Sequence, residues 1–138
     1  MGYYMTLRDC NFTIIKSKFA AAMEALRQLS NKTDDGSGYS NGKRHFAWVN
    51  DSFPDRATLV EMVLDWRWQL DINERTGNVE SISFEGEKLG DDIVLFQALA
   101  TFVKRGSYIV MTGDDGVIWR WKFDGKSVVE QVGRVTFR

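Results

Sequence analysis

The chain has 138 residues, enough for one domain to bury a core without disulfide or metal support. Hydrophobic residues make up 43% and aromatic residues 13%, a composition that excludes an intrinsically disordered chain. The 18 basic and 19 acidic side chains nearly cancel, which disfavours nonspecific nucleic-acid binding because such binding needs clustered positive charge.

One cysteine and one histidine, Cys10 and His45, form neither an internal disulfide nor a conventional zinc site. The first residues lack the basic and apolar regions of a signal peptide. The longest charge-free apolar run, residues 93–103, is about half the length of a membrane span. We therefore expect a cytoplasmic protein without a membrane partner.

In chain order, residues 3–15 predict an opening strand or short hairpin, and the helical period of Phe19, Met23 and Leu26 predicts a helix over residues 18–29. Residues 31–44 are rich in Gly, Asn, Asp and Ser and predict a flexible loop. That loop is either a simple connection or a binding loop, with Tyr39 as its contact residue. Residues 46–49 predict a short strand.

Thr58 and Glu61 have the spacing of a capping box at the start of a second helix. Two strands follow, over residues 68–73 and 78–84. Residues 92–104 predict a third helix that is apolar on nearly every face, which is typical of a helix buried on more than one side.

The last part of the chain predicts three antiparallel strands in a meander, over residues 108–111, 117–123 and 128–137, with tight turns at residues 113–116 and 124–125. The whole of residues 1–138 therefore predicts a single α+β domain. It consists of a mainly antiparallel sheet with three helices, the third of them central and buried.

The sequence Trp-Arg-Trp occurs twice, at residues 66–68 and 119–121. One interpretation is an aromatic platform for a planar ligand, with Arg67 or Arg120 binding a phosphate or carboxylate. The alternative is that the aromatic face of the second copy is the core side of the meander. The predicted binding residues are Tyr39, Arg67, Trp68, Trp119, Arg120 and Trp121.

Paired carboxylates occur at residues 34–35, 91–92 and 114–115, where they could hold a cation or act as an acid and base. Each pair also has a local explanation, as part of a loop, a helix cap or a hairpin turn. The sequence has no nucleotide-binding glycine loop, zinc-protease motif or serine nucleophile motif. We therefore nominate no catalytic residue, metal ligand or cofactor.

A longer pattern resembles small uncharacterised proteins of bacteria and their phages. It includes residues 1–5, residues 61–68, the run Gly86-Glu87-Lys88-Leu89-Gly90-Asp91-Asp92, the apolar helix that follows, Gly106-Ser107-Tyr108-Ile109, and Trp119-Arg120-Trp121. The resemblance spans most of the chain except residues 31–44. Because that group has no assigned activity, the resemblance implies only a small cytoplasmic accessory protein, carried either by a bacterium or by a phage, and it implies no site residues.

Together these observations favour a noncatalytic binding protein that inhibits or sequesters a host component. One alternative is a small-ligand binding protein with an aromatic and arginine pocket for a nucleotide-like molecule, which a deep pocket would favour. Another is a small enzyme that uses Glu85, Glu87, Asp91, Asp92 or His45, which their convergence in a cleft would favour. Oligomeric state stays open, because the last strand could be an exposed edge.

Overall fold

The structure is a computed structural model that describes residues 2–31, 39–40 and 43–133. Its strands are Met5–Asn11 (β1), Tyr39–Ser40 (β2), Lys43–Arg44 (β3), Trp68–Ile72 (β4), Val79–Phe84 (β5), Tyr108–Gly113 (β6), Ile118–Phe123 (β7) and Val128–Val132 (β8). Its α-helices are Phe19–Leu29 (α1), Leu59–Leu64 (α2) and Asp92–Leu99 (α3). This order confirms the predicted α+β fold with antiparallel sheets.

The main sheet has four antiparallel strands in the order β1-β6-β7-β8, and its last three strands are the predicted meander. The turn between β6 and β7 closes through a 3.0 Å hydrogen bond from the Gly116 amide to the Gly113 carbonyl. In the turn before β8, the Asp124 carboxylate accepts the amide N–H groups of Lys126 and Ser127. Short polar turn residues therefore set the register of the meander.

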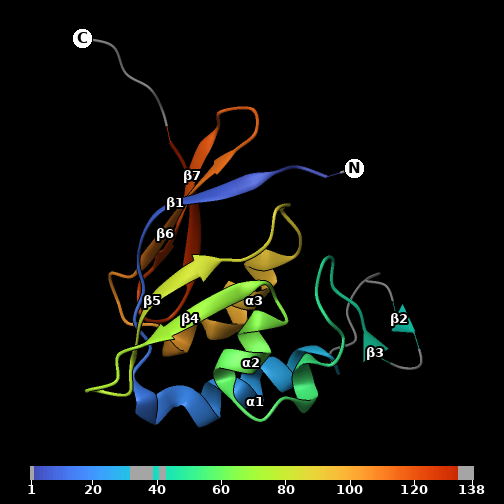
Figure 1. The fold of residues 1–138 in the computed structure, drawn as a ribbon, viewed down its shortest axis with the longest axis vertical. Helices are drawn as coiled ribbons and strands as arrows, with labels where there is room; N and C mark the ends of the chain where they lie inside the picture. The colour runs from blue at the N-terminus through green and yellow to red at the C-terminus, as the bar shows by residue number, and fades with distance from the viewer. Residues whose placement is uncertain (1, 32–38, 41–42, 134–138) are drawn as a thin grey trace.

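The hairpin of β4 and β5 lies beside β1, at one edge of the main sheet (Figure 1). Ile14 and Val79 exchange two backbone hydrogen bonds of 3.0 and 2.9 Å, and the Met5 amide donates to the Glu87 carbonyl at 2.9 Å. The β1 edge is therefore covered. On the opposite edge, no described strand pairs with the outer side of β8.

Helix α3 is the central helix that the sequence predicts, although it is shorter than predicted. Leu95, Phe96 and Leu99 are fully buried, and a 3-10 helix (Ala100–Phe102) follows the last α-helical turn. The predicted end at residue 104 is wrong because residues 103–104 leave the helix to pair with residues 13–14. The Lys104 amide donates to the Thr13 carbonyl at 2.8 Å in that pairing.

The ring of Phe96, in α3, packs against both the main sheet and the β4–β5 hairpin. Its centroid lies 5.1 Å from those of Trp68 in β4 and Trp121 in β7, and 6.0 and 6.4 Å from those of Phe123 and Phe12. Three of these pairs meet edge to face, an arrangement that aromatic rings prefer, and the Phe96–Trp121 pair is tilted. One core therefore lies between α3 and the strands.

Residues 46–49 form a turn, so the predicted strand there is wrong. The Val49 amide donates to the Phe46 carbonyl at 3.3 Å, and the Phe46 ring packs 4.9 Å from Trp66. Burial of Phe46 against another ring, rather than strand pairing, explains the apolar character of this stretch.

The structure covers the predicted loop at residues 31–44 only in part. Within it the backbone of β2 pairs with β3, while residues 32–38 and 41–42 lie outside the described residues. The last strand, predicted over residues 128–137, extends over Val128–Val132 in the structure. Residues 134–138 of that prediction lie outside the described residues. None of the described helices is long and apolar enough to cross a membrane.

Candidate binding surface

The second Trp-Arg-Trp sequence lies on β7, where side chains alternate between the two faces of the sheet. Trp119 and Trp121 face the core and are 7% and 1% exposed. The Trp121 indole Nε1 donates a 2.8 Å hydrogen bond to Glu130. The interpretation of this face as core is confirmed for Trp119, Trp121 and Phe123, whereas Val117, just before the strand, is exposed.

The first Trp-Arg-Trp sequence runs from the turn after α2 into the start of β4. Trp66 and Trp68 are both fully buried, and the Trp68 indole Nε1 donates a 2.8 Å hydrogen bond to Asp92. Of the six predicted binding residues, the structure therefore places Trp68, Trp119 and Trp121 in the core. Trp119 borders two surface hollows, whereas a partner could contact Trp68 and Trp121 only if the fold opened.

Arg67 is held by the loop that precedes α3. Its guanidinium forms two 3.1 Å hydrogen bonds with the buried Asp92 carboxylate and donates to the Lys88 carbonyl at 2.5 Å. Asp92 also accepts the Gly90 amide at 2.8 Å. Because this ion pair occupies the guanidinium, Arg67 fixes residues 85–91 and presents only 17% of its side chain to solvent.

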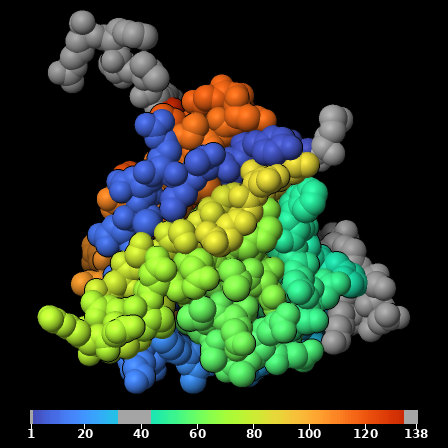
Figure 2. All heavy atoms as spheres, in the orientation of Figure 1, coloured from blue at the N-terminus to red at the C-terminus, as the bar shows by residue number. Residues whose placement is uncertain are grey.

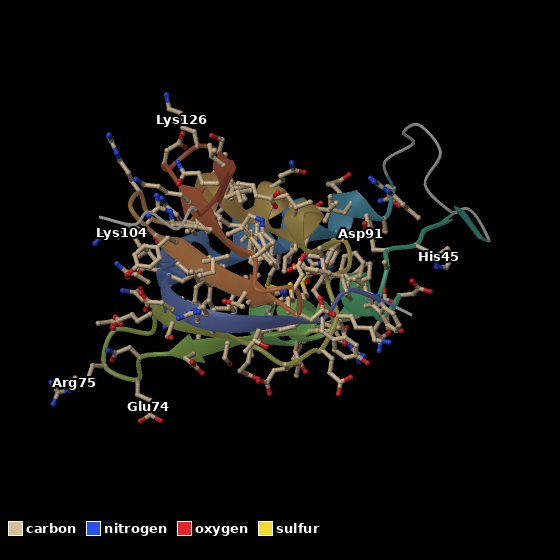
Figure 3. All side chains as sticks on the ribbon, turned by 90° about the horizontal axis from the view of Figure 1, so that it is seen from above. His45, Glu74, Arg75, Asp91, Lys104 and Lys126 are labelled. Atoms are coloured by element: carbon tan, nitrogen blue, oxygen red, sulfur yellow. The ribbon has the colours of Figure 1, made fainter. Side chains whose placement is uncertain are left out.

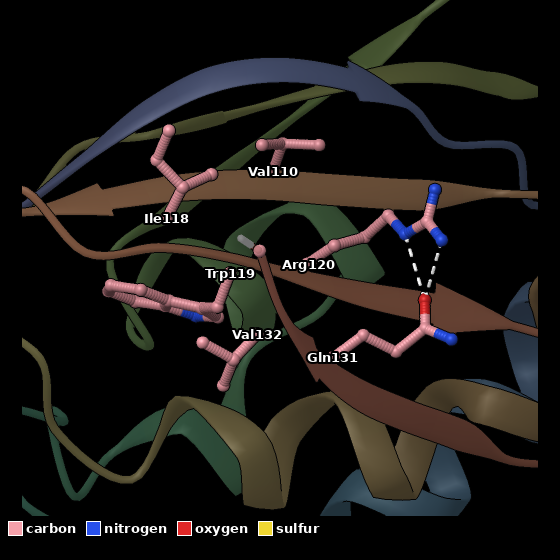
Figure 4. A pocket seen from close by; sticks show the side chains of 7 residues that line it. Val110, Ile118, Trp119, Arg120, Gln131 and Val132 are labelled. Carbon is pink, nitrogen blue, oxygen red and sulfur yellow. Dashed lines mark hydrogen bonds between the residues drawn. The ribbon is translucent and has the colours of Figure 1, made fainter. Parts of the chain in front are cut away.

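Arg120 points away from the core, on the open face of the main sheet, and donates to the Gln131 amide oxygen at 2.6 and 3.0 Å (Figure 4). It lines a shallow hollow of about 450 Å³ together with Val110, Ile118 and Gln131. Arg120 and the rings of Trp119 and Trp121 lie on opposite faces of β7, although Trp119 also borders this hollow. The side chain of Tyr39 lies outside the described residues.

Trp48 differs from the other tryptophans. Four of the five are buried, whereas Trp48 is 52% exposed. Its φ angle is +64°, a left-handed conformation that costs free energy for any residue except glycine. Such strain persists only where the surrounding structure holds it, and it is concentrated at functional sites. Trp48 is therefore the feature from which we build a candidate site.

The loop before α3 holds Trp48 in this conformation. The Ala47 amide donates to the Asp91 carboxylate at 2.7 Å. A Cβ atom at Gly90 would lie 2.5 Å from the Ala47 carbonyl oxygen and 2.8 Å from the Trp48 ring, so only glycine fits there. Arg67, with φ of +72°, contacts the same glycine. The two described non-glycine residues with positive φ thus meet at Gly90.

Lys88 connects Trp48 with a second exposed ring. Its Nζ atom lies 5.3 Å from the Trp48 ring centroid and 5.2 Å from that of Tyr4, which is 48% exposed. Both distances are within the range of cation–π attraction. We call these three residues, Tyr4, Trp48 and Lys88, the aromatic surface. Figure 2 shows the segments that carry them, in blue, teal and yellow, meeting on one face of the molecule.

A small hollow is lined in part by Leu89, the residue that follows Lys88 of the aromatic surface. It has a volume of about 190 Å³, and the exposed Leu89 lies on its rim. The other lining residues are Tyr3, Val117, Trp119, Glu130 and Val132. The Leu89 amide donates to the Tyr3 carbonyl at 2.7 Å, which fixes this part of the loop against the start of β1.

The carboxylates and the histidine that could serve an enzyme have separate partners. Asp92 binds Arg67 and Trp68, Asp91 binds the Ala47 amide, and the His45 ring pairs with Asp51 at 2.7 Å. Glu85 and Glu87 are exposed. Among the described residues, no group of three or more acidic, histidine or cysteine side chains is placed to hold a metal ion.

The chain matches no protein-family model, no curated protein and no solved structure. Its resemblance to small proteins of bacteria and their phages therefore stays a prediction.

Sequence reasoning missed the aromatic surface. Trp48 follows the apolar Phe46 and precedes Val49, so it reads as a strand residue, and Tyr4 reads as the start of a strand. The one available signal is the polar run of residues 50–52, which is typical of a turn and places Trp48 at its beginning. Neither the positive φ nor the contact with Gly90 leaves a local pattern.

Proposed function

We propose that this chain is a noncatalytic binding protein that acts by occupying a protein partner, with the aromatic surface as the contact. The observation that carries this proposal is Trp48, an exposed ring held in a strained backbone conformation by the loop before α3. Tryptophan is among the residues that contribute most at protein interfaces. A ring that is already fixed also loses little conformational entropy on binding.

The separation of the predicted ligand residues supports a protein partner over a small ligand. Trp68 and Trp121 are in the core, Arg67 is paired with Asp92, and Arg120 lies on the other face of the main sheet. The proposed setting is the cytoplasm. Combined with the phage resemblance, the proposed role is inhibition or sequestration of a host component.

The proposal is tested by quantitative affinity capture with a tagged chain expressed in the kind of host cell it comes from. Trp48→Ala should reduce recovery of the specific partner at least tenfold, because it removes the central contact. Ile72→Ala is the matched control. This residue is 39% exposed and lies at the end of β4 before residues 74–75, which Figure 3 shows far from His45 and Asp91.

Equal recovery of the partner by Trp48→Ala and the wild-type chain would show that the aromatic surface is not the contact. Native mass spectrometry of the purified chain provides a second test. A stoichiometric added mass of a few hundred daltons would replace this proposal with small-ligand binding.

A further inference from the structure

The outer edge of β8 has hydrogen-bonding groups without a strand partner in the described structure. The Gly133 amide donates to the Ile118 carbonyl at 2.7 Å, so residues 129, 131 and 133 direct their backbone groups toward β7. The direction of the backbone groups alternates along an antiparallel strand. Val128, Glu130 and Val132 therefore direct their backbone N–H and C=O groups away from the sheet. An edge of this kind is a template for an additional strand.

The open face of the main sheet beside this edge is positively charged. Arg120 and Lys122 lie on it in β7, and Arg105 lines an adjoining hollow of about 370 Å³ with Lys122, Val129 and Gln131. None of these three cations forms a salt bridge with a described residue. Two acids lie near these cations. Asp124 lines the same hollow and accepts hydrogen bonds from its own turn, and Asp9, on the register row of Val110 and Arg120, accepts the Tyr108 hydroxyl. The face therefore favours a negatively charged occupant.

The other side of the same edge is mainly apolar, with the exception of Glu130, whose carboxylate accepts the Trp121 indole N–H. Val132 is 66% exposed and borders the 190 Å³ hollow with Val117 and Leu89, which are 41% and 37% exposed. A strand added to β8 would direct alternate side chains to the two sides. One set would meet the cations of the open face, and the other set would cover these apolar side chains.

We propose that the β8 edge is a docking site for an extended segment of a protein partner in which acidic and apolar residues alternate. Backbone hydrogen bonds to β8 would supply affinity, and the charged and apolar sides would select the sequence. A nucleic acid fits less well, because it leaves the outward N–H and C=O groups of β8 without strand partners. A second copy also fits less well, because it would bring two positive faces together. This inference is independent of the aromatic surface.

The test is fluorescence anisotropy with labelled eight-residue peptides and the full chain. A peptide of alternating valine and glutamate should bind at least tenfold more tightly than its valine and lysine counterpart, a comparison that needs no variant. The double change R120E and K122E should weaken binding of the glutamate peptide at least tenfold. The control Arg75→Glu, in the distant β4–β5 turn (Figure 3), should leave binding unchanged.

A second pair of variants tests the backbone contact. Val132→Pro removes an outward N–H and should weaken binding of the glutamate peptide at least fivefold relative to Val132→Ala, which keeps that N–H while losing the same side chain. Circular dichroism confirms that each variant is folded.

Three results would overturn the inference. The first is equal binding of the two peptides, and the second is equal binding by Val132→Pro and Val132→Ala. The third is another occupant: either an oligothymidylate that binds more tightly than the glutamate peptide and depends on Arg120 and Lys122, or a dimer that Val132→Pro converts to monomer.

Discussion

Trp48 has a strained backbone conformation, and burial of its ring does not offset the free energy that the strain costs. A left-handed φ costs a non-glycine residue about 1–2 kcal/mol, and 52% of this residue stays in solvent. Natural proteins keep such local conflicts at functional positions. At the scale of single residues, stability and function should therefore respond in opposite directions when Trp48 is replaced.

We predict that Trp48→Gly is neutral or raises the free energy of unfolding by up to about 1 kcal/mol, because glycine adopts the left-handed conformation without strain. Urea denaturation measures this change. Trp48→Ala, which keeps the strain, should be less stable than Trp48→Gly. A loss of more than about 2 kcal/mol in Trp48→Gly would instead assign the ring a structural role, of the size expected for a buried side chain.

Asp92 is a buried carboxylate that serves three donors: the Arg67 guanidinium, the Trp68 indole and the Gly90 amide. We predict that Asp92→Asn lowers the free energy of unfolding by about 3 kcal/mol or more, because the largely buried Arg67 charge loses its partner. Chemical denaturation measures the loss. The adjacent Asp91→Asn should cost less than about 1 kcal/mol, since an amide oxygen can still accept the Ala47 N–H. Similar losses in the two variants would contradict the assignment.

At the scale of elements, the start of β1 is tied to the β6–β7 turn. The Tyr3 hydroxyl donates to Asp115, and this hydrogen bond, followed by burial and the charge of Asp115, raises the pKa of Tyr3 to about 12. The same bond, together with the Val117 amide, lowers the pKa of Asp115. Gly113 must be glycine for this contact, because a Cβ there would lie 1.6 Å from the Tyr3 hydroxyl oxygen.

The raised pKa of Tyr3 gives stability a defined dependence on pH. The contribution of the hydroxyl is fully present below the ordinary pKa of 10.0 and is lost as the pH rises toward about 12. We predict that the melting temperature of the wild-type chain falls more steeply over this interval than that of Tyr3→Phe. Tyr4→Phe is the control and should follow the wild type. Parallel curves for wild type and Tyr3→Phe would show that the hydroxyl does not couple to folding.

At the low end of the pH scale the sign is reversed. The lowered pKa values of Asp115 and Asp124, the latter caused mainly by hydrogen bonds from the Ser127 and Lys126 amides, stabilise the folded chain above the ordinary pKa of 3.8. That contribution disappears as the pH falls through the folded-state values. Both turns of the meander should therefore weaken in acid.

At the scale of the whole molecule, one aromatic cluster connects α3 with both sheets, and Phe96 lies at its centre. We predict that Phe96→Ala lowers the free energy of unfolding by about 3–5 kcal/mol, the usual cost of truncating a buried ring. Far-ultraviolet circular dichroism and tryptophan fluorescence should follow a single transition, because helices and strands share this core. Leu64→Ala, at a residue 44% exposed, is the control and should change stability by less than about 1 kcal/mol. Two separate transitions would contradict a shared core.

Much of the fold could be predicted because its patterns are local. The alternation in β7 placed Trp119 and Trp121 on one face and Arg120 on the other, and the turn residues at 113–116 joined two strands. The absence of charge over residues 93–103 predicted the burial of α3. Residues 46–49 were predicted incorrectly because an apolar run of four residues fits a strand and a buried turn equally well.

The candidate site could not be predicted in the same way. Trp66, Trp68, Trp119 and Trp121 attract attention because they lie in a repeated motif, yet all four are core residues. Trp48 lies outside any motif. Its exposure follows from contacts with residues about 40 positions later in the chain, which no local pattern records.

The amino-acid sequence by itself determined the class of the fold, the meander and the buried third helix, because periodicity and turn chemistry act over a few neighbouring residues. It left open whether the Trp119 and Trp121 face of the meander is core or surface, and the burial of those rings decided that. Only the tertiary structure decided that Trp48 faces solvent, that Asp92 holds Arg67, and that no described strand pairs with the outer edge of β8. Those outcomes depend on which distant segments pack together, and packing between distant segments follows from the whole chain rather than from any one stretch of it.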